Sequence, residues 1–366
     1  MKFTTSQTEL KNIKQNFLSN IKEKFVPVFI SAIYETNKVQ IKYTVGDDII
    51  QVELSCYVSV GGSIRVHHIT DFATAIKKLQ SGSVEVSFEK GNPDQIVFQQ
   101  KNRRIVATAE KIHDLDECPF ISKPHSSIPI TELTNLKNLL KPAMYAISKD
   151  EYDFGKQGVL LEFTPNSVSA IGTDRYRFSK NTTNDICTDI SKQVSCFIPT
   201  LYLNILTKLA NSCKIRIDTH KKTTYISGDN FAMQFKSDTK DFPQYQKAIT
   251  QTGKIISFKR KELMQDVEAL MRINGRETEI HLLPLNKTTT SIKAACDKVE
   301  SEFELDTVYS NTDISEVRFN PVRLFEMLSQ VKSDLVSLRH TDNKSAFFVI
   351  ECNSEYNRMH GLMPLK

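Results

Sequence analysis

Apolar side chains recur at helical spacing in three similar segments of the chain. These segments begin at Phe3, Ile128 and Phe258 and read FTTSQTELKNIKQNFL, IPITELTNLKNLL and FKRKELMQDVEAL. Each joins a short extended start to a Glu-Leu pair and an amphipathic stretch, which is typical of a helix that covers a core with one face. The apolar stripe of the first segment consists of Leu10, Ile13, Phe17 and Ile21. The pattern therefore predicts three equivalent helices.

A second helical pattern follows later in each third of the chain. It covers residues 68–79, 198–209 and 320–331, and Pro199 and Pro321 suit a first helical turn because no amide hydrogen is needed there. After each of these helices comes an alternating strand pattern, and a polar turn then leads to a further strand. The order helix, strands, helix, strands thus occurs three times.

This internal repeat predicts the domain organisation. We expect three α+β domains over residues 1–124, 125–251 and 252–366, each with two helices packed on antiparallel sheets. Helices do not alternate with single strands, and neither a G-x-G-x-x-G nor a phosphate-loop motif occurs. The pattern therefore does not indicate a parallel nucleotide-binding sheet.

Composition narrows the class of protein further. The net charge of +5 permits binding to nucleic acid without requiring it. No window approaches the roughly 18 apolar residues of a membrane span, and the start MKFTTSQTEL lacks the apolar core of a signal peptide, so we expect a cytoplasmic protein. The seven cysteines form no C-x-x-C pair and the histidines show no zinc spacing, so we expect buried thiols, no metal and no cofactor.

Several short motifs, in order along the whole chain, resemble those of one family. They are MKFT at the start, GTDRYRFS at 172–179, DFPQYQ at 241–246, FNPVRLFEML at 319–328 and LMPLK near the end. Each motif is short, but together with the length and the threefold repeat they are fairly specific. The sequence resembles a bacterial sliding clamp, the beta subunit of DNA polymerase III, as a divergent member.

The resemblance implies both a fold and a function. The fold is the DNA clamp fold, and two chains associate head to tail into a ring with helices around the hole and sheets outside. Such a ring encircles double-stranded DNA without reading its sequence and tethers the polymerase to its template, and it carries out no chemistry. The implied partners are a second copy of the chain, the catalytic subunit of DNA polymerase III, the clamp loader, and other repair or replication proteins.

A ring that slides needs basic side chains that contact only phosphates. Lysines recur on the predicted helices of all three domains, and the resemblance adds positions where relatives contact DNA. Acidic residues such as Asp71 and Asp266 lie on the same helices, so a merely solvated helix face is the alternative interpretation. The residues expected to bind DNA are Lys11, Lys14, Lys24, Lys77, Lys137, Lys141, Lys149, Lys208 and Arg272.

A head-to-tail interface needs two different, complementary surfaces. The first domain offers a basic strand, and the third offers glutamates at period two, hence on one face of a strand. An ordinary polar strand face is the alternative. The expected interface residues are Arg103 and Arg104 on one side, Glu300, Glu302 and Glu304 on the other, and Ile76, Leu79, Met271 and Ile273 as the apolar part.

The resemblance also implies a pocket for partner peptides between the second and third domains. Apolar anchors fit Phe178, Pro243, Leu362 and Met363. Asp174 is expected to shape the turn through its side chain, because no catalytic partner motif accompanies it. The implied pocket residues are Thr173, Arg175, Tyr176, Arg177, Phe178, Pro243, Lys247, Ala248, Asn320, Arg323, Leu362, Met363, Pro364 and Leu365.

The implied pocket departs from the pattern of the family. Arg175 stands at the position of a small glycine, Glu277 falls near a usual phenylalanine, and Lys344 stands where an apolar residue is common. We therefore expect a conserved scaffold with an altered pocket that binds standard clamp-binding peptides weakly.

Other classes of protein remain open at this point. A clamp paralogue outside bulk replication has the same fold, and a monomeric scaffold could bind proteins without DNA. An enzyme that uses the 173–178 cluster on a phosphorylated substrate is a third class. No nucleophile, metal site or phosphate loop accompanies that cluster, so we expect a non-catalytic protein.

Overall fold

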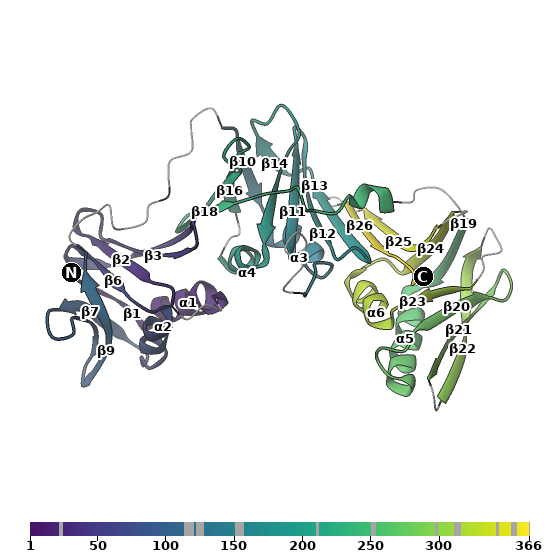
Figure 1. Ribbon diagram of the computed structural model, residues 1–366, viewed down its shortest axis with the longest axis horizontal. Helices are drawn as coiled ribbons and strands as arrows, with labels where there is room; N and C mark the ends of the chain where they lie inside the picture. Colours follow the sequence, from purple (N-terminus) through teal and green to yellow (C-terminus); the bar gives the residue numbers. More distant parts are fainter. Residues whose placement is uncertain are drawn as a thin grey trace. The chain divides into compact units, whose positions relative to one another are not determined.

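The computed structural model describes most of the 366 residues. The residues outside its described part are 22–24, 113–120, 122–127, 151–156, 210–211, 250–253, 297–298, 311–315, 342–343, 353–356 and 366. The α-helices in the described part are α1 (Gln7–Asn16), α2 (Ile69–Lys77), α3 (Leu136–Met144), α4 (Thr200–Leu209), α5 (Arg260–Asn274) and α6 (Pro321–Gln330). All six helices begin within the segments that the apolar pattern predicts, but α3 and α5 continue four residues beyond them, and Figure 1 shows the helices along the chain.

The chain divides into two compact units. Unit 1 consists of Met1–Lys137, Cys187–Cys196 and Leu201–Asp238, and unit 2 consists of Asn138–Ile186, Phe197–Thr200 and Thr239–Lys366. The predicted central domain thus contributes to both units, and the division into three domains remains a prediction. No helix within the described ranges is long and apolar enough to cross a membrane.

Unit 1 is built on one antiparallel sheet with the strand order β14-β10-β16-β17-β18-β4-β3-β2-β6-β9-β8-β7-β1-β5. Helices α1 and α2 pack against each other and belong to this unit. Its strands are β1 (Lys2–Ser6), β2 (Val28–Ile33), β3 (Lys38–Val45), β4 (Asp48–Ser55), β5 (Tyr57–Val60), β6 (Gly62–Val66), β7 (Ser83–Glu89), β8 (Gln95–Gln100), β9 (Arg103–Lys111), β10 (Ile130–Thr134), β14 (Ile186–Thr188), β16 (Ser212–Asp218), β17 (Thr223–Ser227) and β18 (Phe231–Lys236).

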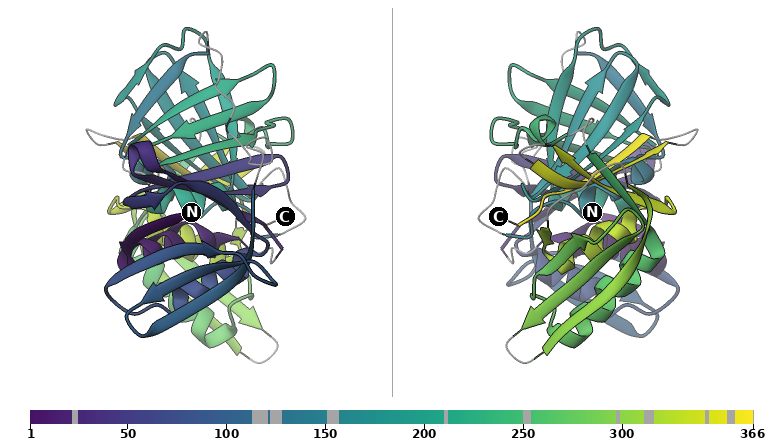
Figure 2. Two further views of the ribbon diagram at one scale, coloured as in Figure 1. Left: turned by 90° about the vertical axis from the view of Figure 1, so that its left-hand side faces the viewer. Right: turned by 90° about the vertical axis from the view of Figure 1, so that its right-hand side faces the viewer.

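Unit 2 is built on a second antiparallel sheet with the order β15-β11-β12-β13-β26-β25-β24-β19-β22-β21-β20-β23. Figure 2 shows the twist of the strands. Its strands are β11 (Gly158–Thr164), β12 (Ser167–Thr173), β13 (Arg177–Thr183), β15 (Val194–Pro199), β19 (Lys254–Lys259), β20 (Ile280–Pro284), β21 (Thr289–Cys296), β22 (Val299–Ser310), β23 (Val317–Phe319), β24 (Leu335–Thr341), β25 (Lys344–Cys352) and β26 (Asn357–Leu362).

Local signals explain where the helices begin. Ser6 and Glu9 form a capping box at α1, because the Ser6 hydroxyl accepts the Glu9 amide while the Glu9 carboxylate accepts the Ser6 amide. At α6 the Asn320 side chain accepts the Arg323 amide, and Pro321 occupies the first helical turn as expected. These caps satisfy amides that the helix itself leaves without partners.

The buried faces of the helices form the cores. In unit 1, Phe17 of the turn after α1 packs edge-on against Tyr43 of β3, and Phe72 of α2 lies near Phe98 of β8. In unit 2, α5 and α6 pack on each other over a cluster of buried side chains that includes Phe258. This burial of apolar area stabilises both units.

The cysteines follow the expectation in part. Cys196 and Cys213 are buried, whereas Cys56 is half-buried and Cys296 is exposed. Burial raises the pKa of the Cys196 and Cys213 thiols to about 12, so both stay protonated at neutral pH.

Candidate functional site

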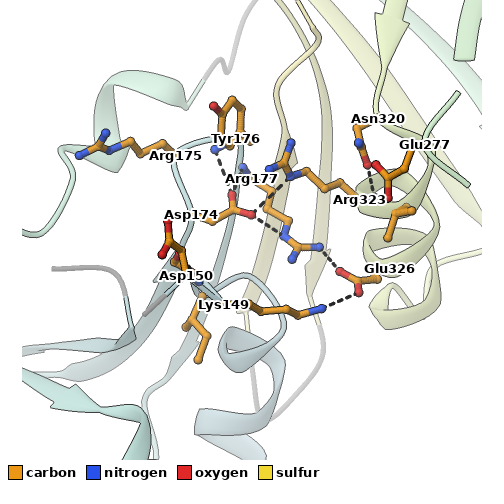
Figure 3. Close-up of a pocket in the computed structure, with 13 residues that line it drawn as sticks. Lys149, Asp150, Asp174, Arg175, Tyr176, Arg177, Glu277, Asn320, Arg323 and Glu326 are labelled. Atoms are coloured by element: carbon orange, nitrogen blue, oxygen red, sulfur yellow. Dashed lines mark hydrogen bonds and ion pairs between the residues drawn. The ribbon is translucent and has the colours of Figure 1, made fainter. Parts of the chain in front are cut away.

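A cavity of about 560 Å³ lies within unit 2. Its walls come from the loop after α3, the β12–β13 hairpin, the loop after α5 and the first turns of α6 (Figure 3). The lining residues are Ile147, Ser148, Lys149, Asp150, Asp174, Arg175, Tyr176, Arg177, Glu277, Asn320, Val322, Arg323 and Glu326.

The hairpin that enters this cavity is shaped by its own side chains. The Asp174 carboxylate accepts the amides of Tyr176 and Arg177 at 3.0 and 2.9 Å, which confirms its expected role in the turn. The Thr173 hydroxyl accepts the Arg175 amide at 3.1 Å and donates to the Arg177 carbonyl at 2.8 Å. Arg175 has a positive φ of 75°, a backbone conformation that glycine adopts with less strain. The turn therefore presents the side chains of residues 175 and 176 outward.

Arg177 is the buried charge at the base of the cavity. Its side chain is 4% exposed, its Nε lies 3.1 Å from the Asp174 carboxylate, and its Nη1 donates to Glu326. The guanidinium carbon also lies 5.5 Å from the centre of the Tyr145 ring. Lys149 reaches the other oxygen of Glu326 at 2.9 Å. Three segments far apart in the sequence are thus held by one network of ion pairs.

The surroundings of Glu326 determine its protonation. Burial alone would raise the pKa of this carboxyl group, but hydrogen bonds from Arg177 and Lys149 outweigh burial and hold the pKa below its ordinary value. The network therefore keeps Glu326 ionised at neutral pH.

A stacked pair forms the wall above this network. The Arg323 guanidinium lies 4.1 Å from the centre of the Tyr176 ring, and its Nε is 3.6 Å from Asp174. Tyr176 is 50% exposed, so one face of the stack is open to a ligand. The amide of Met363 donates to the Tyr176 carbonyl at 2.7 Å, which joins the C-terminal tail to the hairpin.

The structure separates the expected pocket residues into two groups. Arg175, Tyr176, Arg177, Asn320 and Arg323 line the cavity together. The residues that do not line it are buried Thr173, Phe178 and Leu362, partly exposed Pro243, Met363, Pro364 and Leu365, and Lys247 and Ala248, whose side chains lie outside the described part.

Phe178 and Leu362, which are expected among the apolar anchors of the pocket, are buried and do not line the cavity. Strand β26 lies beside β13, so that Phe178 is opposite Gly361. A Cβ at position 361 would lie 2.2 Å from the Phe178 ring, so the ring covers the glycine closely. Both side chains therefore belong to the interior of unit 2.

The DFPQYQ segment is held by a buried tyrosine. The Tyr245 hydroxyl donates to Glu162 at 2.8 Å, and Lys180 donates to the same hydroxyl at 3.3 Å. Tyr245 also packs with Leu160 and Ile171. The motif thus has a structural role at the surface of β11 and β12, apart from the cavity.

Sequence reasoning missed Glu326 and assigned Lys149 to DNA alone. Glu326 lies between Phe325 and Met327 in α6, and nothing in its local pattern distinguishes it from other glutamates of the chain. Only the packing of α6 beside β26 brings it to Arg177. The GTDRYRFS motif was the signal that located the opposite wall.

The residues expected to bind DNA lie mainly on helices. Lys11 and Lys14 are half-buried on α1, whereas the other described members are exposed. Arg272 pairs with Glu268 at 2.6 Å, Lys208 donates to the Gln15 carbonyl, and Lys24 lies outside the described residues. Their arrangement is compatible with a basic surface, and their role stays a prediction.

The expected interface residues need one correction. Ile76 and Leu79 are buried in unit 1, and Met271 is buried in unit 2, because each belongs to the inward face of its helix or turn. Ile273, by contrast, is 50% exposed, and Val106 of β9, which was not expected at the interface, is 41% exposed.

The charged interface residues are exposed on two strands. Arg103 and Arg104 lie on β9, where Arg104 pairs with Glu89 at 2.7 Å. Glu300, Glu302 and Glu304 are exposed on β22, and Glu302 also accepts a hydrogen bond from Ser291.

Within the described ranges, no group of three or more His, Cys, Asp or Glu residues is arranged to hold a metal ion.

Curated proteins and solved structures that resemble this chain are beta sliding clamps. No family model matches the sequence. The chain is 25% identical over 373 residues to a protein named beta sliding clamp from Chlamydia pneumoniae, covering 96% of this chain and 98% of that protein. It is 21% identical over 352 residues to the beta sliding clamp of Chlamydia muridarum, covering 94% of this chain and 93% of that protein.

The fold is also that of solved clamps. The crystal structure of the DNA polymerase III subunit beta from Pseudomonas aeruginosa superposes with a TM-score of 0.83 at 16% identity, over 100% of both chains. In sequence along nearly its whole length, and in fold, the chain is similar to bacterial beta sliding clamps.

Proposed function

We propose that this protein is the processivity factor of a DNA polymerase. Two copies, each with domains 1–124, 125–251 and 252–366, join head to tail into a ring that encircles double-stranded DNA. The ring slides without reading sequence, tethers the polymerase and performs no chemistry itself. The observation that carries the proposal is the similarity to a beta sliding clamp over 96% of the chain.

Two open strand edges support the closure of a ring. Among the described strands, residues 103–108 of β9 pair only with β8, and residues 299–306 of β22 pair only with β21. One edge carries arginines and the other glutamates, so the edges are complementary in charge. Exposed Val106 and Ile273 supply apolar contact nearby. An unpaired edge can add a strand from a second chain.

Basic side chains on the helices support a sequence-independent contact with DNA. Lysines occur on α1, α2, α3 and α4, where long side chains can reach phosphates. Lys149 is shared between this role and the cavity, because its ammonium group already pairs with Glu326. We expect it to contribute less to DNA binding than an unpaired lysine.

The cavity in unit 2 is the proposed docking site for the catalytic subunit of the polymerase, the clamp loader and other replication or repair proteins. Its lining is charged where apolar anchors were expected. Standard clamp-binding peptides should therefore bind weakly. A fluorescence-polarisation titration that finds ordinary micromolar affinity for such a peptide would overturn this expectation.

The molar mass in solution tests the ring. Light scattering over a dilution series should give the mass of two chains. The dimer should then remain on nicked circular DNA at a salt concentration that removes ordinary phosphate contacts, and should leave when that DNA is cut. A single-chain mass at all concentrations would favour the monomeric scaffold. A dimer that never remains on circles would favour a paralogue without a role on DNA.

A further inference from the structure

The cavity is lined mainly by charge. Eight of its 13 lining residues are Lys, Arg, Asp or Glu, and the aliphatic ones are only Ile147 and Val322. An apolar anchor inserted here would remove water from charged groups without giving them new partners, which is unfavourable. A ligand that fits this cavity therefore has polar or charged side chains.

Most of these charges already have partners. Asp174, Arg177, Glu326 and Lys149 form the network at the base, and Arg323 joins it through Asp174 and stacks on Tyr176. These groups form the scaffold of the cavity and are not free to pair with a ligand without breaking an existing contact.

Three charged lining residues remain, and one of them, Asp150, also has a partner. Two side chains of opposite sign are then left. In the described part of the structure, the guanidinium of Arg175 and the carboxylate of Glu277 have no hydrogen bond or ion pair, and both residues are exposed. Figure 3 shows them on opposite sides of the cavity, with the stack of Tyr176 and Arg323 between them. The cavity thus has a positive end and a negative end.

We propose that this cavity binds an extended segment of a partner protein that carries an acidic side chain for Arg175 and a basic side chain for Glu277. The inference rests on the proposed role of the cavity as a docking site. The exposed face of Tyr176 supports the middle of the segment. Because the two free charges differ in sign, the cavity selects partners by the order of charges along the segment, in addition to shape.

Isomeric peptides test this selection. Two short peptides labelled with fluorescein have the same Gly, Ser and Leu residues in the middle, and one begins with Glu and ends with Lys while the other has these two exchanged. Because the two isomers have the same net charge, any general attraction to a protein of charge +5 is the same for both and cancels in the comparison. A third peptide has Gln at both ends. Affinities are measured by fluorescence polarisation on the full-length protein.

The wild-type protein should bind one charged isomer at least about five-fold more tightly than the other. The double variant Arg175→Glu with Glu277→Lys should invert this preference. Both positions are exposed, and the new residue at 175 is again not glycine, so the turn keeps a similar backbone cost. The matched control Lys221→Glu with Asp229→Lys makes the same charge changes at exposed positions of unit 1 and should keep the wild-type preference.

Each other outcome overturns the inference. Equal affinity for the isomers, or a preference that the double variant leaves unchanged, would show that these two charges do not select the ligand. Tighter binding of the Gln peptide would show that charged ends on the ligand do not strengthen binding to this cavity. If no peptide binds, the cavity is not a docking site for such segments. Retention on circular DNA is measured separately, so a failure here is distinct from a failure of the ring.

Discussion

Arg177 and Glu326, 149 residues apart in the sequence, form an ion pair that joins the β12–β13 hairpin to helix α6. The guanidinium is almost fully buried, so the pair depends on the complete set of neighbours that surround it. The Asp174 carboxylate lies 3.1 Å from its Nε, and the centre of the Tyr145 ring lies 5.5 Å from the guanidinium carbon. The geometry of the cavity therefore depends on this one side chain.

Replacement of Arg177 with methionine should destabilise unit 2 by roughly 2–4 kcal/mol, because two carboxylates lose a buried partner. Urea unfolding followed by far-ultraviolet circular dichroism measures the change, since the chain has no tryptophan to report it. Lys149→Met is the matched control. It removes the exposed partner of the same carboxylate and should cost less than about 1 kcal/mol. Equal losses for the two variants would contradict the central role of Arg177.

The lowered pKa of Glu326 predicts a dependence of stability on pH. A carboxyl group with a lower pKa in the folded protein binds fewer protons there than in the unfolded chain. Its stabilising effect is thus complete above the ordinary glutamate pKa of about 4.3 and is lost as the pH falls through the folded value. Between about pH 6 and pH 3, the urea midpoint should fall more in the wild type than in Glu326→Gln. Parallel curves would exclude a contribution from this residue.

The close approach of Gly361 to Phe178 predicts a coupled pair of substitutions. Gly361→Ala should destabilise the protein by about 1–3 kcal/mol, because the added methyl group meets the ring. Phe178→Leu removes the ring atoms of that contact, so the double variant should lose less than the sum of the two single losses. A double-mutant cycle in thermal unfolding measures the coupling, and strict additivity would argue against the contact.

The complementary strand edges predict the effect of charge reversal on the proposed dimer. Arg103→Glu and Glu304→Lys should each weaken association by about ten-fold, because each places like charges at the interface. The combination should recover part of the loss. Arg103 is chosen over Arg104 because the latter already pairs with Glu89. Sedimentation velocity over a dilution series measures the dissociation constants. If the double variant loses as much association free energy as the two single variants together, the two edges do not meet in the dimer.

The lysines of the helices predict the salt dependence of DNA binding. On linear duplex DNA, the logarithm of the affinity falls linearly with the logarithm of the salt concentration. Lys14→Ala and Lys141→Ala should each make this slope less steep by about 0.9, because one phosphate contact is lost. Lys221→Ala, an exposed change at a turn of unit 1, is the control and should leave the slope unchanged. An unchanged slope for all three would favour the interpretation of an ordinary solvated helix face.

The parts of this fold that were predictable from sequence have short-range causes. The spacing of apolar residues within a few turns predicts a helix, and Pro321 marks the first turn of α6. The turn around Asp174 is formed by hydrogen bonds to the amides two and three residues further along the chain. The resemblance of short motifs then located one wall of the cavity. All of these signals lie within a few residues of the feature that they predict.

Other features depend on contacts between distant segments and could not be predicted in this way. Phe178 and Leu362 are expected as anchors of the pocket because nothing local indicates that β26 lies beside β13 and buries them. Glu326 is one of 43 acidic residues, and its partner is fixed only when α6 packs in place. Burial and ion pairing follow from the strand order, which the apolar pattern does not determine.

The position of β26 has a consequence for the synthesis of the protein. This last strand lies between β13 and β25, so β13 has a free edge for as long as residues 357–362 are absent. On the ribosome, more than 170 residues must follow β13 before its neighbour exists. A nascent chain that terminates before residue 357 would leave the edges of β13 and β25 unpaired and part of the core of unit 2 exposed. Both features favour aggregation and binding by chaperones. Completion of unit 2 therefore waits until residues 357–362 have been synthesised.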